Sequence, residues 1–317
     1  MTQQSDVSAD LVVHRLQEMG CPFVRLNCER LLSDVQLSIR EPEGAACFVD
    51  EAGERADLRT TRAIWYRSPQ LPAASAELSV PNARFAQREA WAHVLGLLMS
   101  IDAWWMSNPA AIWRANQKVF QLAAARRAGL RIPRTCITRS PEEAWSFIRS
   151  LGAFVIAKPV TYGNVEGTTP EQAIYTTRVP ADIRRAEVEE IVLAPVILQE
   201  EIAKRRDVRV TVIGRELFAV GIESQAHLET TTDWRRPLAA PLEHVNMDLP
   251  ADLRAALCEF VHELGLDFGA IDLVETPAGE FYFLEINPNG QWGWLQLRTG
   301  LDLAGVIAAR LAERSRR

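Results

Sequence analysis

The sequence predicts an α+β protein that begins with an α/β domain of about a hundred residues, because helix and strand signals alternate through residues 9–66. The amphipathic pattern of residues 116–128 predicts a helix that Gly129 ends. Residues 270–287 predict two strands joined by a turn at residues 276–279, since Pro and Gly favour a turn and β-branched and aromatic residues flank it.

Composition excludes several classes of protein. The chain has 317 residues, 48% of them hydrophobic, which is enough for two or three subdomains. The formal net charge is −6 and no basic face is evident, so we expect no nucleic-acid partner. Five cysteines without a CxxC pair indicate reduced thiols. Without an apolar run of ~20 residues or a signal pattern, we expect a cytoplasmic protein with no membrane partner.

The segment after the first strands carries a stripe of large apolar side chains. Residues 84–106 are expected to form one long helix, and its stripe packs in a core or against another domain; it consists of Trp91, Leu95, Leu98, Trp104 and Trp105. Residues 107–109 break this helix, and we place the first domain boundary between residues 107 and 115.

The hairpin at residues 270–287 collects oxygen-bearing side chains on one face. If Glu275 lies opposite Glu280, then Asp272 lies opposite Phe283. Alternation along the strands then places Asp272, Phe283, Glu285 and Asn287 on one face. The other face, which we expect to point into a core, carries Tyr282, Leu284 and Ile286.

Two carboxylates and an amide on one face predict a Mg²⁺ site. Close carboxylates repel each other unless a cation lies between them. Mg²⁺ typically takes one or two carboxylates together with substrate phosphates. The alternative is a half-exposed strand whose polar residues face water. Against it, residues 288–290 end the strand beside the polar group, and Phe281 and Phe283 share its face.

Lys158 ends an apolar strand pattern at residues 153–158. A buried lysine loses much hydration unless an anion meets it. The next segment, residues 161–169, has two glycines and several hydroxyls, and its backbone N–H groups could bind phosphate oxygens. The alternative is a lysine that extends its head group into water at a strand end.

Two further segments place charges near strands. Residues 191–202 form a buried strand pattern that becomes acidic at its end. In residues 204–213, Asp207 and Arg209 are two apart and share a face, as a nucleotide-facing pair would. A surface ion pair fits the same spacing and would stabilise little. The polar segment 230–236 is either a mobile charged loop or part of a site.

These motifs carry a family resemblance over nearly the whole chain. Asp272 with residues 285–287 resembles the metal-binding end of the ATP-grasp ligases, and residues 283–292 resemble the microviridin-type ATP-grasp peptide maturases, which make graspetides. Residues 23–27 and 64–67 resemble the N-terminal domain of those maturases. The resemblance implies an ATP-grasp fold with a pre-ATP-grasp domain at 1–112, a central subdomain at 113–190 and a C-terminal subdomain with the Mg²⁺ site at 191–317.

The resemblance also assigns roles to individual residues. Lys158 would contact the α- and β-phosphates, and Lys118 matches an earlier nucleotide lysine, although an exposed helix lysine is the commoner explanation for such a residue. Further ATP contacts are implied for Gln199, Glu200, Glu201, Ile202 and Asp207. Arg209 and Arg235 take catalytic roles, and Mg²⁺ is held by Asp272, Glu285 and Asn287. A leader peptide would dock near residues 210–224.

The reaction implied is ATP-dependent. A carboxylate attacks the γ-phosphate to give an acyl phosphate and ADP, and a nucleophile then displaces phosphate. By resemblance, the carboxylate is an Asp or Glu of a ribosomally made precursor peptide, and a Ser, Thr or Lys of the same peptide closes an ω-ester or ω-amide. Two alternatives stay open: a ligase that joins amino acids or modifies a protein terminus, and a nucleotide-dependent peptide-binding protein without turnover. A homodimer is also left open.

Overall fold

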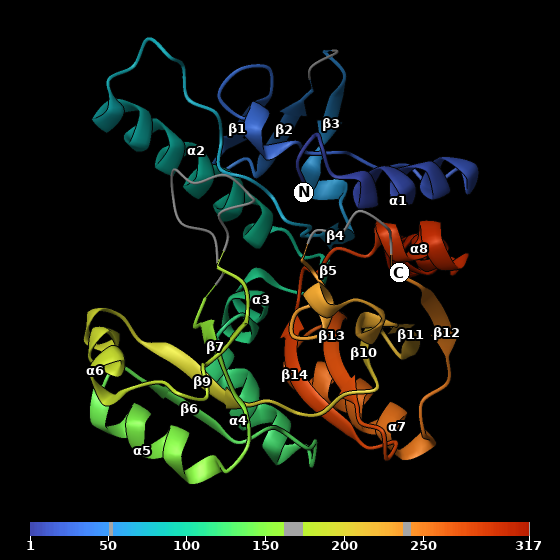
Figure 1. Cartoon of the computed structure of the whole chain (residues 1–317). Coiled ribbons are helices and arrows are strands. Elements are labelled where there is room, and N and C mark those ends of the chain that lie inside the picture. Colours follow the sequence, from blue (N-terminus) through green and yellow to red (C-terminus); the bar gives the residue numbers. More distant parts are fainter. Residues whose placement is uncertain (51–52, 162–173, 237–241, 317) are drawn as a thin grey trace. The chain divides into compact units, whose positions relative to one another are not determined.

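The computed structural model describes residues 1–50, 53–161, 174–236 and 242–316 (Figure 1). They form two compact units, one of Met1–Pro109 with Gln291–Arg317 and one of Ala110–Gly290. Among the helices of these described ranges, none combines the length and the apolar character that a bilayer span requires. Most of the predicted phosphate-binding loop at 161–169 lies outside the described residues.

The first unit contains two small sheets and four α-helices within its described residues. An antiparallel sheet has the order β1 (Gln36–Arg40), β2 (Ala45–Val49), β3 (Arg55–Asp57), and β4 (Ala63–Trp65) pairs in parallel with β5 (Trp104–Met106). The helices are α1 (Val7–Glu18), α2 (Val80–Ser100), α8 (Gly293–Thr299) and α9 (Leu303–Ser315).

The predicted helix at residues 84–106 is wrong at its C-terminal end. Helix α2 ends at Ser100, and Trp104 and Trp105 lie in β5, opposite Ala63 and Ile64. Aromatic side chains suit a pleated strand, so pairing with β4 outweighs the helical spacing. The guanidinium groups of Arg310 and Arg314 then cover the Trp104 ring at 5.6 and 5.1 Å from its centroid.

Residues 291–317 were expected in the C-terminal sheet domain, but they pack in the first unit. Helix α9 contacts α1 and β4. Its buried residues recur every three to four positions, which is the spacing of one helix face; they include Leu303, Ile307 and Leu311. Asp302 also pairs with Arg15 of α1 at 3.1 Å.

The second unit begins with α3 (Pro109–Ala115) and α4 (Lys118–Arg127), followed by a four-stranded sheet in the order β6 (Thr135–Thr138), β9 (Val196–Glu200), β7 (Val155–Pro159), β8 (Thr177–Arg178). Helices α5 (Pro141–Leu151) and α6 (Arg185–Val188) accompany this sheet. The side chain of Ser140 caps α5 by accepting a hydrogen bond from the backbone N–H of Glu143. Strand β9 was expected in the C-terminal subdomain, but it pairs with β6 and β7 of this sheet.

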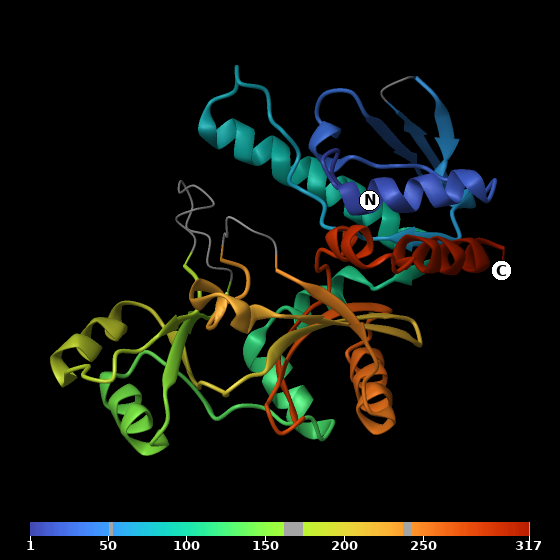
Figure 2. The ribbon, with the colours of Figure 1, turned by 45° about the vertical axis from the view of Figure 1, so that its right-hand side comes forward.

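A five-stranded sheet completes the second unit. Its order is β12 (His244–Met247), β11 (Glu216–Ile222), β10 (Arg206–Ile213), β13 (Phe268–Glu275), β14 (Phe281–Asn287). Helix α7 (Ala251–Glu263) lies along one side of the sheet (Figure 2). There Phe260 meets Phe283 edge to face, with 5.2 Å between ring centroids. The opposite face of β10, β13 and β14 is therefore left for the polar side chains predicted to form a site.

Candidate active site

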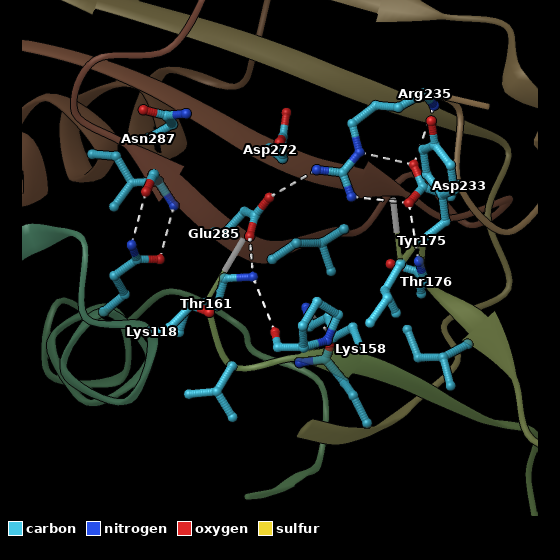
Figure 3. A pocket seen from close by; sticks show the side chains of 18 of the residues that line it. Lys118, Lys158, Thr161, Tyr175, Thr176, Asp233, Arg235, Asp272, Glu285 and Asn287 are labelled. Atoms are coloured by element: carbon cyan, nitrogen blue, oxygen red, sulfur yellow. Dashed lines mark hydrogen bonds and ion pairs between the residues drawn. The ribbon is translucent and has the colours of Figure 1, made fainter. Parts of the chain in front are cut away.

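The second unit contains a cavity of about 770 Å³ lined by residues of both of its sheets and of α4 (Figure 3). A volume of this size is typical of a site for a small molecule or cofactor. Most of the predicted site residues line it, namely Lys118, Lys158, Gln199, Asp207, Arg235, Asp272, Glu285 and Asn287. Residues far apart in the sequence thus meet around one polar space.

The predicted site residues Glu200, Glu201, Ile202 and Arg209 lie outside this lining. The backbone N–H of Glu200 donates to Arg134 and that of Glu201 to Phe154, each at 2.8 Å. The Glu201 carboxylate accepts two hydrogen bonds from Arg178. Adenine recognition by this segment stays a prediction, and the backbone N–H groups of Glu200 and Glu201 are already engaged in this structure.

The register of the β13–β14 hairpin differs from the predicted one. Glu275 lies opposite Phe281 rather than Glu280, so the turn is one residue longer than predicted. A register shift between Asp272 and Leu273 then leaves Leu284 as an extra residue in β14. Beyond it, Asp272 lies opposite Glu285.

The longer turn and the extra residue Leu284 each shift the register by one residue. Their effects cancel for Glu285 and Asn287, which follow Leu284, but not for Phe283, which precedes it. The longer turn alone would face Glu285 away from Asp272, and the extra residue returns it to the same face. Asp272, Glu285 and Asn287 therefore share the cavity face, as predicted. Phe283 instead faces α7, and Leu284, predicted for the core, lines the cavity.

Glu285 lies among three cations (Figure 3). Its carboxylate oxygens are 3.3 Å from Lys118 Nζ and 3.5 Å from Arg235 Nη1. Burial raises the pKa of Glu285, but the charges of Lys118, Lys158 and Arg235 outweigh burial and hold this pKa below its usual value. The cavity thus presents an ionised carboxylate at neutral pH.

Lys158 is held by a neutral partner. Its Nζ donates to Gln199 Oε1 at 3.0 Å, and Gln199 Nε2 donates to Thr135 Oγ1 at 2.8 Å, which fixes the orientation of the amide. Burial lowers the pKa of Lys158 to about 8, Glu285 opposes this shift, and Lys118 adds to it. An anionic ligand beside Lys158 would raise this pKa and favour the charged form.

Arg235 is oriented by Asp233, a residue that the sequence analysis missed. Arg235 Nε and Nη2 each donate to the Asp233 carboxylate at 2.9 Å (Figure 3). The backbone N–H groups of Arg235 and Thr176 also donate to that carboxylate, at 3.1 and 3.3 Å. Burial raises the pKa of Asp233, but Arg235 outweighs burial and lowers it. The spacing of Asp233 and Arg235 could have indicated this contact, because an Asp carboxylate often accepts a hydrogen bond from the backbone N–H two residues further along the chain.

Asp207 and Arg209 do share a face of β10, as predicted, but each has its own partner. Asp207 pairs with Lys204 at 2.8 Å, and burial raises its pKa against the charge of Lys204. Arg209 lies opposite Asp272 in the ladder, and their side chains pair at 2.7 Å. Arg209 therefore acts on the cavity through Asp272.

The donor atoms fit Mg²⁺ bound together with phosphates. Within the described ranges there is no group of three or more His, Cys, Asp and Glu side chains suited to a metal. The cavity offers hard oxygen donors from Asp272, Glu285 and Asn287, and phosphate oxygens would complete the coordination of Mg²⁺. The nearby lysines and Arg235 would meet the remaining phosphate charge.

Two sheets around a cavity that combines lysine and arginine side chains with oxygen donors define a nucleotide-dependent ligase of the ATP-grasp class. Residues 115–311 match the model of the RimK-like ATP-grasp domain, and residues 1–113 match that of the MvdD pre-ATP grasp domain. The chain belongs to the RimK-like ATP-grasp family. The predicted fold and the predicted enzyme class, an ATP-grasp ligase, are confirmed.

Solved structures resemble both units of the chain. A RiPP-associated ATP-grasp ligase of Chryseobacterium gregarium, in complex with ADP and a leader and core peptide, is 28% identical, with a TM-score of 0.88 over 99% of this chain and 95% of that one. The macrocyclase MdnC of Microcystis aeruginosa, bound to the precursor peptide MdnA, is 25% identical, with a TM-score of 0.87 over 99% and 98%. A probable α-L-glutamate ligase of Serratia proteamaculans is 28% identical over 80% of this chain and 81% of its own length.

Proposed function

We propose that this protein is an ATP-dependent ligase that closes macrocycles in a ribosomally made precursor peptide. It would activate Asp or Glu side chains as acyl phosphates and join them to Ser, Thr or Lys side chains as ω-esters or ω-amides. The observation that carries this proposal is the similarity of both units to a ligase that holds ADP with a leader and core peptide and to a macrocyclase that holds its precursor.

The cavity residues supply binding and charge rather than a side-chain nucleophile. Asp272, Glu285 and Asn287 would hold Mg²⁺. Mg²⁺ would supply neutralisation of the charge that develops on the transferred phosphate. Lys118 and Lys158 bring two amines to the same space, where the anionic oxygens of ATP would lie. Such catalysis depends on positioning and on preorganised charge.

Arg235 is the residue best placed to meet the peptide carboxylate and the acyl phosphate. Asp233 fixes one edge of its guanidinium, while Nη1 points toward Glu285. A planar guanidinium offers several donors to the oxygens of an acyl phosphate. The peptide hydroxyl or amine then attacks the acyl carbon and gives up its proton to the departing phosphate or to water, and phosphate leaves with the C–O bond pair.

The hairpin of β10 and β11 is the proposed docking place of the leader peptide, near residues 210–224. Most side chains of this range are buried within the sheet. Arg215 and Glu216 are exposed at the tip. We also propose a cytoplasmic location, because the five cysteines are free thiols.

A glutamate ligase is the second candidate, because curated relatives with that name align over most of this chain. Incubation with ATP, Mg²⁺ and a candidate precursor separates the possibilities. The precursor would come from a short open reading frame beside the gene, carrying repeated Thr and Glu or Asp. A decrease in peptide mass by one water per bond formed supports the proposal. A mass gain on an amino-acid acceptor supports the second candidate. Peptide binding without ADP release contradicts both.

A further inference from the structure

The side-chain amide of Gln121, on α4, pairs with the peptide that separates two of the proposed metal ligands. Its Nε2 donates to the carbonyl of Ile286 at 2.8 Å, and its Oε1 accepts from the N–H of Ile286 at 3.1 Å. Nε2 also donates to the carbonyl of Ala115 at 2.6 Å. The Gln121 side chain is buried, so these are contacts out of water.

This contact satisfies the outward-facing backbone groups of Ile286 at the edge of the sheet, beside the proposed metal site. Strand β14 is the last strand of the five-stranded sheet, and an edge strand has backbone groups that no neighbouring strand satisfies. One glutamine supplies both the donor and the acceptor that a further strand would offer at Ile286. On the other side of the extra residue Leu284, the N–H of Phe283 donates to the carbonyl of Arg131 at 2.8 Å. The strand segment that carries Glu285 is thus held from outside at two points.

We propose that Gln121 is a positioning residue for the metal site. Glu285 and Asn287 flank Ile286, so fixing the Ile286 peptide fixes the directions in which both side chains leave the strand. Lys118 lies one turn before Gln121 on α4 and reaches Glu285 at 3.3 Å. Docking of α4 through Gln121 therefore sets the carboxylate and its cation together. This inference rests on the proposed function, which assigns Mg²⁺ to these oxygen atoms.

Glutamine is required at this position by its hydrogen-bonding groups. It offers one acceptor for the Ile286 N–H and two donors for the carbonyls of Ile286 and Ala115. Gln121→Met keeps the length and volume but leaves all three backbone groups without this partner. Gln121→Glu keeps the acceptor and loses the donors when ionised.

The test measures ADP affinity by calorimetry with and without Mg²⁺ on the full-length protein. In the wild type, we expect Mg²⁺ to strengthen ADP binding, because both would occupy the cavity. Gln121→Met is expected to reduce this strengthening by about tenfold or more, the usual effect of removing a group that orients metal ligands. ADP affinity without Mg²⁺ should fall by a smaller factor, because Lys118 on the same helix loses only part of its alignment. The KM for Mg²⁺ in ADP formation should rise more than kcat falls. Gln121→Glu should lie between Gln121→Met and the wild type.

Leu257→Ala serves as the control, because it removes buried volume on α7, which contacts β10 and β11 and carries none of the proposed metal ligands. It should lower Tm and leave the effect of Mg²⁺ on ADP binding unchanged. If the effect of Mg²⁺ survives in Gln121→Met, or falls equally in Leu257→Ala, the inference is wrong. If both Gln121 variants fail to fold, the contact serves the fold, which also overturns a positioning role. If Mg²⁺ has no effect in the wild type, the proposed function fails, and this inference fails with it.

Discussion

Lys118 Nζ lies 3.3 Å from the carboxylate of Glu285, so a proposed phosphate ligand and a proposed metal ligand are paired with each other in this structure. Asp272 is paired in the same way with Arg209 at 2.7 Å. Each carboxylate thereby keeps a counter-charge in a partly buried space. Binding of Mg²⁺ and nucleotide would exchange these partners, since Mg²⁺ takes the carboxylates and the phosphates take Lys118.

Glu285→Gln should abolish ADP formation while the fold survives. The substitution removes an ionised oxygen donor that lies among three cations, and we expect a loss of at least about a hundredfold in kcat. ADP release and a thermal melt measure the two effects. Glu280→Gln on the same hairpin is the control, because Glu280 pairs with Arg131 at the surface. A variant that unfolds, or one with full activity, contradicts the assignment.

ADP binding should take up a proton near pH 8. The pKa of Lys158 is lowered to about 8 by burial, and phosphates beside it favour the charged amine. Uptake should reach about half a proton per ADP near pH 8 and vanish about two pH units lower, where the amine is already charged. Calorimetry in buffers of different ionisation enthalpy measures the uptake. Lys158→Met should show none, and uptake that persists in this variant rules out Lys158 as its source.

The same lysine affects stability with a defined sign. Its folded pKa lies below the unfolded value, so between about 8 and 10.5 the unfolded chain binds more protons. The contribution of Lys158 to the free energy of unfolding therefore rises with pH across that window. Denaturant titrations of wild type and Lys158→Met at several pH values measure the difference between them. A difference that falls with pH would contradict a lowered pKa of Lys158 in the folded protein.

Asp233→Asn should lower kcat through Arg235. The amide cannot accept both charge-assisted hydrogen bonds from the guanidinium, so Arg235 loses its fixed orientation. We expect a loss of about tenfold or more in kcat. A double-mutant cycle with Arg235→Lys checks the route, because the second substitution should add little once the first is made. Fully additive losses would mean that Asp233 acts independently of Arg235.

Phe283→Ala tests the register of the β13–β14 hairpin, which carries the proposed metal ligands. In the structure Phe283 is 1% exposed and packs on Phe260, so its loss should cost about 3–5 kcal/mol of unfolding free energy. ADP affinity should stay near that of the wild type, because this side chain points away from the cavity. In the register predicted from sequence, Phe283 lines the site, and the variant would lose ADP affinity instead. Denaturant titration and calorimetry separate the two.

The contrast between Glu285 and Phe283 shows how far sequence patterns reach. Alternation along β14 places Glu285 and Asn287 on one face. Asp272 joins them because the longer turn and the extra residue cancel each other. It does not reveal the longer turn or the extra residue at Leu284, since a bulge carries no fixed side-chain signature. Local spacing also assigned Trp104 to a helix, although a strand distant in sequence pairs with it.

Contacts between distant segments account for the remaining differences. Gln121 meets Ile286 through its side chain, and nothing near residue 121 in the sequence indicates that contact. Residues 291–317 follow the β13–β14 hairpin in the chain but pack with α1. Most residues that the family resemblance singled out line the cavity, which patterning alone did not indicate. The resemblance did not include Asp233, although its spacing from Arg235 was visible in the sequence.

The most direct measurement is a crystal structure with Mg²⁺ and a non-hydrolysable ATP analogue. We predict an ion bound by oxygen atoms of Asp272, Glu285 and Asn287 and by the analogue's phosphates, with Lys118 moved from Glu285 to a phosphate oxygen. An analogue bound elsewhere, or one bound here with no ion among those three side chains, would contradict the account.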